Sequence, residues 1–307
     1  MEQDGISFNT MVQMGFSESA AREALHRSGG NLERAIDSLL SCQQDSNNNT
    51  MSRGNISSTQ NGSLQSGTNF IDNHNNVMVH SEVSQFTFPN GRSACTCIAL
   101  SSATLGLKKL SENSSNPDFC GDVINAELIQ DAIIAGVGMY ENRPITALGI
   151  EHMSVEEVLH SLPLYSAELQ LIGDVRQGIV STNRNQNDMG IRSILTSCRE
   201  DGNANKSKWM SIVMTKTPET VAIFLPPIDA KDFNSWSFKN FVLIDSHSRP
   251  QFSTVPGGSY AMIFENMDDL VRILDKLFPV TDLGSDVGEV MSMMYNSFDV
   301  YAFQLKT

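Results

Sequence analysis

Apolar and polar positions follow three different patterns along this chain of 307 residues. Residues 6–41 carry apolar side chains at helical spacing in three short runs, which are separated by glycines at Gly15 and at Gly29-Gly30. Residues 42–79 are rich in Asn and Ser and show no period, so they cannot bury enough apolar surface to offset the entropy of ordering. The pattern predicts a small three-helix domain, a disordered linker and one large domain over 80–307.

Within the large domain, helical patterns come first and strand patterns follow. Small and apolar residues after the turn Pro89-Asn90-Gly91 predict a buried helix that begins near Cys95. Further helices are predicted over 127–140, from a Ser154–Glu157 capping box onward, over 188–197 and over 267–277. Runs rich in β-branched and aromatic residues predict strands over 169–172, 209–214, 220–225, 241–244, 260–264 and 301–305. Helices followed by strands in this order indicate an α+β fold.

Composition excludes several classes of partner and site. The net charge of −14, without a basic run, disfavours nucleic acid as a partner. The N-terminus lacks an apolar signal segment, and no apolar run approaches the ~20 residues of a membrane span, so no membrane partner is expected. Five scattered cysteines form neither a disulfide framework nor a zinc pattern, which indicates the reducing cytosol or nucleus. No cofactor or metal is implied.

The cysteine at the start of the predicted buried helix is a candidate nucleophile. A helix N-terminus presents free N–H groups and the positive end of the macrodipole, and both favour a thiolate. Cys95 follows the turn most closely, and Cys97 stays open as the alternative because it lies in the same first turn. Cysteine hydrolases commonly place the nucleophile on such a helix and bring a histidine from elsewhere in the fold.

Among six histidines, His247 has the most favourable surroundings for a catalytic base. It follows the predicted strand 241–244, and Asp245 precedes it by two positions, so both side chains point to one face of an extended chain. A carboxylate there can fix the imidazole tautomer and stabilise the imidazolium. Asn266 is the alternative third residue. The other histidines lie in less promising places: His26, His74, His80, and His152 and His160 on the surface of a predicted helical region.

The N-terminal residues resemble the ubiquitin-associated (UBA) domain. Met14-Gly15-Phe16, Ala21-Arg22-Glu23-Ala24-Leu25, Gly29-Gly30-Asn31 and Ala35-Ile36-Asp37-Ser38-Leu39-Leu40 follow the family pattern in order and spacing. The family usually binds the apolar patch of ubiquitin through its first loop and the end of its third helix. Carried over, the resemblance implies a ubiquitin-binding site made by Met14, Gly15, Phe16, Asp37 and Leu40.

Two segments of the large domain resemble the herpesvirus tegument deubiquitinases and their tegument-like relatives, which are papain-fold cysteine proteases. The first is Gly91-Arg92-Ser93-Ala94-Cys95; the second is Asp245-Ser246-His247-Ser248-Arg249 followed by Gly257-Gly258-Ser259-Tyr260-Ala261. The resemblance implies a papain-like domain with Cys95 as nucleophile, His247 as base and Asp245 as its partner. Many members carry a glutamine upstream that helps form the oxyanion hole, and Gln85 occupies the matching position.

Together the two resemblances predict a deubiquitinase that acts on ubiquitin, polyubiquitin chains or ubiquitinated proteins. A flexible linker would hold the weak ubiquitin-binding domain near the hydrolase at high effective concentration. Two alternatives stay open: a non-catalytic ubiquitin receptor whose cysteine and histidine are structural, and a cysteine protease for another ubiquitin-like modifier.

Overall fold

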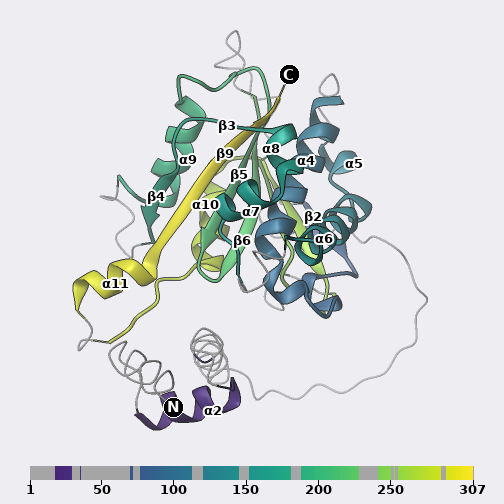
Figure 1. Ribbon diagram of the computed structural model, residues 1–307. Coiled ribbons are helices and arrows are strands. Elements are labelled where there is room, and N and C mark those ends of the chain that lie inside the picture. Colours follow the sequence, from purple (N-terminus) through teal and green to yellow (C-terminus); the bar gives the residue numbers. More distant parts are fainter. Residues whose placement is uncertain are drawn as a thin grey trace, which may run out of the picture. The chain divides into compact units, whose positions relative to one another are not determined.

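A computed structural model describes residues 18–29, 35, 70–71, 77–112, 120–144, 152–180, 188–227, 241–249, 252, 255–284 and 288–306 (Figure 1). The chain divides into two compact units. The smaller unit comprises residues 1–64 and 281–295, and the larger comprises residues 65–280 and 296–307. The predicted ubiquitin-binding residues Met14, Gly15, Phe16, Asp37 and Leu40 lie outside the described residues.

The described part of the smaller unit includes helix α2 (Glu18–Arg27) and most of helix α11 (Glu289–Asn296). Ala24 and Leu25 of α2 are buried, as is Ala35. On the opposite side of α2, the exposed pair Glu23 and Arg27 forms an ion pair one helical turn apart. The predicted apolar face of this helix is therefore present.

The larger unit is built on one antiparallel sheet, in which the described residues form nine strands (Figure 1). Eight of them follow the order β1-β2-β8-β7-β6-β5-β9-β3, and β4 also pairs with β9. The strands are β1 (Phe70–Ile71), β2 (Val77–Ser81), β3 (Leu169–Leu171), β4 (Arg176–Ile179), β5 (Met210–Lys216), β6 (Glu219–Leu225), β7 (Phe241–Asp245), β8 (Ser259–Phe264) and β9 (Ser297–Leu305).

Helices cover both faces of this sheet. One apolar cluster joins α4 (Cys95–Glu112), α6 (Ala126–Glu141), α7 (Val155–Ser161) and α8 (Pro163–Glu168) to one face. A second cluster joins α9 (Ile191–Glu200) and α10 (Met267–Leu277) to the other face. Alternate residues of the central strands enter alternate clusters: Ala222 and Phe224 of β6 face α4, whereas Val221 and Ile223 face the second cluster. A short helix, α5 (Cys120–Val123), precedes α6.

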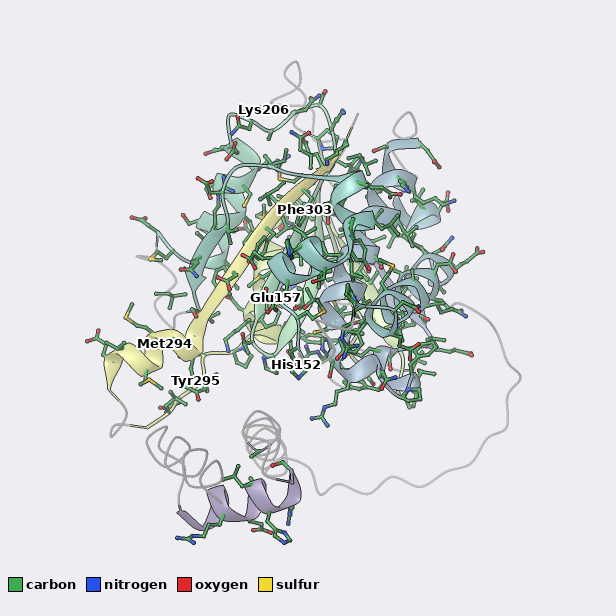
Figure 2. All side chains as sticks on the ribbon, viewed as in Figure 1. His152, Glu157, Lys206, Met294, Tyr295 and Phe303 are labelled. Atoms are coloured by element: carbon green, nitrogen blue, oxygen red, sulfur yellow. The ribbon has the colours of Figure 1, made fainter. Side chains whose placement is uncertain are left out.

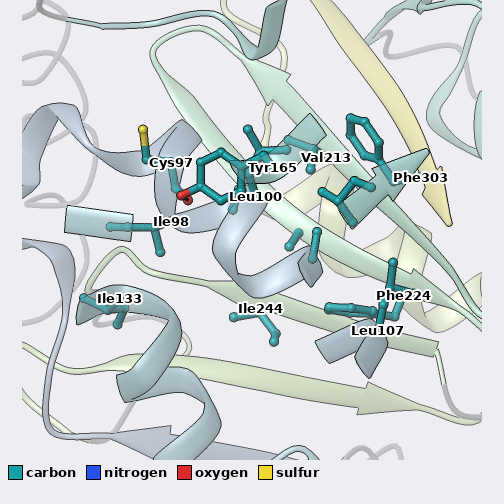
Figure 3. Packing of buried hydrophobic residues seen from close by; sticks show 14 of the residues in the cluster. Cys97, Ile98, Leu100, Leu107, Ile133, Tyr165, Val213, Phe224, Ile244 and Phe303 are labelled. Atoms are coloured by element: carbon teal, nitrogen blue, oxygen red, sulfur yellow. Dashed lines mark hydrogen bonds between the residues drawn. The ribbon is translucent and has the colours of Figure 1, made fainter. Parts of the chain in front are cut away.

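Helix α4 occupies the centre of the first cluster because its small residues allow close approach. A Cβ added at Gly136 of α6 would lie 2.4 Å from the Cα of Ile98, and one added at Gly106 would lie 2.4 Å from the ring of Phe224. Figure 3 shows Ile98, Leu100 and Leu107 of α4 among residues from the sheet and from α6 and α8. The helix is buried along most of its length, which fixes the position of its first residue, Cys95.

The α+β class and most predicted elements of the large domain are confirmed. The capping box at Ser154 and Glu157 is present at the start of α7. The predicted start of the domain at residue 80 is too late, because β2 begins at Val77 and pairs with β8, and β1 also lies within the predicted linker. Strand β4 and helix α11 were not predicted. Among the helices of the described ranges, none combines the length and apolar character needed to cross a membrane.

Candidate active site

Two short turns place Cys95 at the first position of α4. The 3-10 turns η1 (Gln85–Thr87) and η2 (Gly91–Ser93) fold against each other before the helix. A Cβ at Gly91 would lie 1.8 Å from the backbone oxygen of Gln85, so only glycine allows this contact. The N–H of Ala94 then bonds the Gly91 carbonyl at 3.0 Å. The predicted helix start is confirmed, and the Cys95 thiol lies where the macrodipole favours a negative charge.

The Cys95 side chain is 3 % exposed and lies against the hairpin that joins β5 to β6. Its Sγ is 3.6 Å from the carbonyl oxygen of Pro218 and 3.9 Å from the Thr220 hydroxyl. The Thr220 hydroxyl also contacts the hydroxyls of Thr96 at 3.3 Å and Thr215 at 3.1 Å. The hairpin therefore fixes the nucleophile candidate from the sheet side.

The electrostatic surroundings make the Cys95 thiol more acidic than an ordinary cysteine. Burial alone would raise its pKa. A side-chain hydrogen bond with His152 and the charges of His247 and His152 outweigh burial, so the pKa of Cys95 lies below its usual value. A lowered pKa is the property that distinguishes a reactive cysteine from a structural one.

Cys97 lies two residues away in the opposite environment. Figure 3 shows it among the buried residues around α4, and its side chain is part of the apolar cluster. Burial, together with the charge of nearby Cys95, raises the pKa of Cys97 to about 12. A thiol in such surroundings stays protonated and inert at neutral pH. Of the two candidates left open by the sequence, the geometry and charge favour Cys95.

The structure brings His247 and Asp245 into direct contact at the end of β7. The Nδ1 atom of His247 lies 2.6 Å from Oδ1 of Asp245, which also accepts a 2.9 Å bond from the His247 backbone N–H. Burial lowers the pKa of His247, but the Asp245 carboxylate raises it more, so the net pKa is above the ordinary histidine value. Because Nδ1 faces Asp245, Nε2 is the ring nitrogen that does not face the carboxylate.

Asp245 is fully buried and holds its charge through three neighbours. Its Oδ2 accepts from Arg249 Nε at 3.0 Å and from the Tyr260 hydroxyl at 3.1 Å, while its Oδ1 faces His247. Burial raises the pKa of Asp245, but the charges of Arg249 and His247 hold the pKa well below its usual range. A buried carboxylate stays ionised at neutral pH only with such partners.

Gln85 connects the turn before α4 to the histidine loop. Its Oε1 accepts from the Ser246 hydroxyl at 2.7 Å, and its backbone N–H bonds the Ser246 carbonyl at 3.1 Å. Its Nε2 donates to the Arg92 carbonyl at 3.3 Å. These bonds fix which end of the Gln85 amide is the donor.

The geometry also bears on the alternative third residue of the site. Asn266, the alternative third residue, caps α10 by accepting from the Asp269 N–H at 2.9 Å, whereas Asp245 is the residue bonded to His247. Phe86 stands beside the site: its ring centroid lies 6.0 Å from that of His247 in an edge-to-face arrangement, and it is 52 % exposed. In the described part of the chain, His, Cys, Asp and Glu form no cluster of three or more that could hold a metal ion.

The expectation that His152 lies on an unremarkable helical surface is wrong. His152 precedes α7 (Figure 2), and the buried neighbours Met153 and Val155 join the cluster around α4. This packing places the half-buried imidazole close enough to the Cys95 thiol to lower its pKa. The sequence gives no signal for this contact, because the two residues are 57 positions apart.

Replacing His152 by alanine is expected to raise the pKa of Cys95, because the interaction and the charge that lower it are lost. The measurement is the rate of alkylation of Cys95 by iodoacetamide across pH, followed by peptide mass mapping. His160→Ala, at an exposed position of α7, is the matched control. An unchanged midpoint in His152→Ala would show that this imidazole does not act on the thiol.

Comparison with known proteins supports the N-terminal assignment. Residues 9–39 match the UBA/TS-N domain family, so the resemblance of the N-terminal region to UBA domains is confirmed. No curated protein shows significant sequence similarity to the chain. Among solved structures, the chain is similar to the ubiquitin-specific protease encoded by tegument protein M48 of murine cytomegalovirus, solved in complex with a ubiquitin-based suicide substrate. The two share 10 % sequence identity at a TM-score of 0.46, over 75 % of this chain and 86 % of the viral chain.

Proposed function

We propose that this protein is a deubiquitinase: a papain-like cysteine hydrolase that cleaves the isopeptide bond after the C-terminal Gly-Gly of ubiquitin. The observation that carries the proposal is the Cys95 thiol, whose pKa is lowered at the start of a buried helix within the field of an Asp245-bound His247. A thiol with an adjacent imidazole, itself oriented by a carboxylate, is the arrangement used for acyl transfer. The UBA family match at residues 9–39 supports ubiquitin as the substrate class.

In the proposed reaction, the Cys95 thiolate attacks the carbonyl carbon of the terminal glycine and forms a C–S bond. The carbonyl π electrons move to oxygen, and the resulting oxyanion accepts from Gln85 Nε2 and from the backbone N–H of Cys95. The C–N bond then breaks while His247 donates its proton to the leaving lysine amine. Water, deprotonated by His247, hydrolyses the thioester and regenerates the thiol. Asp245 keeps the imidazole oriented throughout.

Ubiquitin that carries a C-terminal propargyl group tests both recognition and nucleophile. We expect a covalent adduct of one ubiquitin per chain, mapped by mass spectrometry to Cys95. The Cys95→Ser variant is the control and should form none. An adduct on Cys97 would reassign the nucleophile.

Reaction only with warheads of other ubiquitin-like modifiers would contradict ubiquitin as substrate and favour a protease for one of those modifiers. If the folded wild-type protein forms no adduct with any of these probes but binds ubiquitin, the proposed catalysis is wrong and the chain is a ubiquitin receptor.

A further inference from the structure

The hairpin between β5 and β6 contacts both halves of the candidate active site. On one face of the sheet, Pro218 and Thr220 touch the Cys95 thiol at 3.6 and 3.9 Å. Thr220 shares this face with Ala222, which packs in the cluster around α4. The contact between hairpin and thiol is therefore anchored in the main core of the larger unit.

Glu219, which lies between those two residues, points to the opposite face. Its Oε2 accepts from Arg249 at 2.6 Å, and Arg249 in turn donates through Nε to Oδ2 of Asp245 at 3.0 Å. Tyr260, directly opposite Asp245 on β8, completes the coordination of the same oxygen. One ion-pair chain therefore runs from the hairpin through Arg249 to the carboxylate that holds His247.

The ion pairs that link Glu219, Arg249 and Asp245 differ from surface ion pairs because their side chains are largely buried. The side chains of Arg249 and Glu219 are 12 % and 26 % exposed, and Asp245 is 0 % exposed. Partly buried charges are screened less than exposed ones, and removing one partner leaves the other without compensation. The planar fork of arginine presents donors to two carboxylates in a fixed geometry, whereas the lysine ammonium is a compact charge on a flexible stem.

We propose that Glu219 and Arg249 are positioning residues that tie the Asp245–His247 pair to the hairpin holding the Cys95 thiol, so that imidazole and thiol keep one mutual geometry. The inference rests on the proposed function, because it assigns these residues to the same site. Neither residue touches the reacting atoms, and their effect passes through Asp245 and the hairpin. Misplacement of a catalytic group by about 1 Å can lower a rate by about 100-fold.

The charges around His247 give this role a measurable pH signature. Asp245 and Glu219 raise the pKa of His247, and Arg249 lowers it. Two further groups belong to this electrostatic environment. The charge of His152 acts on Cys95 together with that of His247, and the Tyr260 hydroxyl donates to Asp245. Removing the Glu219 charge therefore lowers the pKa of His247, so that the imidazolium is lost at a lower pH.

Glu219→Gln is the first test variant, because glutamine keeps the shape and an acceptor oxygen but loses the charge. We expect the alkaline limb of the pH profile for cleavage of a ubiquitin–fluorophore substrate to move to lower pH. Arg249→Lys keeps a charge but loses the planar fork that holds both carboxylates in one geometry, and kcat is expected to fall by about 100-fold with KM little changed. Glu219→Asp restores the charge, so its alkaline limb should return toward that of the wild type.

Arg176→Lys is the matched control, because Arg176 forms a similarly buried ion pair with Asp201 at 2.5 Å between β4 and the end of α9. Its pH profile and kcat should match the wild type. Two results together would overturn the positioning role. The pH profile of Glu219→Gln would coincide with that of the wild type, and the loss of kcat in Arg249→Lys would be no larger than in the control.

The alkylation profile of Cys95 with iodoacetamide provides a second readout that needs no ubiquitin. If the wild type does not cleave ubiquitin, the proposed function fails while this profile still tests the inference. A shift in Glu219→Gln relative to the wild type would support the bridge, and an unchanged profile would refute it.

Discussion

Cys95→Ala is expected to lower kcat/KM for a ubiquitin–fluorophore conjugate by about 10⁵- to 10⁶-fold. The alanine methyl group cannot form the thioester, and the remaining groups of the site have no covalent intermediate to stabilise. Ubiquitin binding should be retained, because the UBA-matching residues 9–39 are unchanged. Fluorophore release gives the rate, and titration with labelled ubiquitin gives the binding.

Cys97→Ala is the control that separates nucleophile from core. Cys97 packs in the buried cluster, so its truncation should reduce the free energy of unfolding by about 1 kcal/mol while most of the activity remains. An inactive Cys97→Ala beside an active Cys95→Ala would reverse the assignment. Equal, slow rates in wild type and Cys95→Ala would remove the cysteine from any catalytic role.

The features that the sequence predicted correctly are local ones. The helix that begins at Cys95 follows from a turn and a run of small residues, both readable within about fifteen positions. The contact between Asp245 and His247 follows from their spacing of two positions at a strand end. In each case the chemistry depends on neighbours in the chain, so no knowledge of the sheet order is needed.

The contacts that complete the site depend on sheet register and helix packing, which the sequence does not encode locally. Thr220 and Pro218 reach Cys95 because β6 packs under α4, and Glu219 reaches Arg249 because β6 lies beside β7. Arg249 stands in the same short motif as Asp245, yet its bond to Glu219 spans 30 positions. The effect of His152 on the pKa of Cys95 cannot be predicted from the sequence for the same reason, since the two side chains meet only in the folded chain.

The large domain begins earlier in the chain than predicted, and the reason is also a long-range contact. Val77-Met78-Val79 is an apolar run of only three residues that follows an Asn-rich stretch. The composition of the preceding residues therefore favours a linker up to Val79. Its strand exists because β8 offers an edge, with Val79 paired to Ala261 and His80 to Tyr260. A pairing across about 180 positions contributes stability that no local propensity records.

His247→Asn is expected to lower kcat/KM at neutral pH by about 10³- to 10⁵-fold, somewhat less than loss of the thiol. The smaller effect is reasonable because a cysteine retains some thiolate without a base, which a serine does not. The variant loses the imidazolium whose charge lowers the pKa of Cys95, so less thiolate forms at neutral pH. It also loses the proton that the leaving amine requires.

These two losses can be separated by pH. Alkylation of Cys95 needs only the thiolate, so in His247→Asn it should recover as pH rises past the ordinary thiol pKa of about 8.5. Isopeptide cleavage should not recover, because expulsion of the amine still lacks an acid. His160→Asn serves as the control for replacing an exposed histidine. A His247→Asn variant with a wild-type pH profile would assign the base elsewhere, and His152, the other imidazole that acts on the thiol, would be the next candidate.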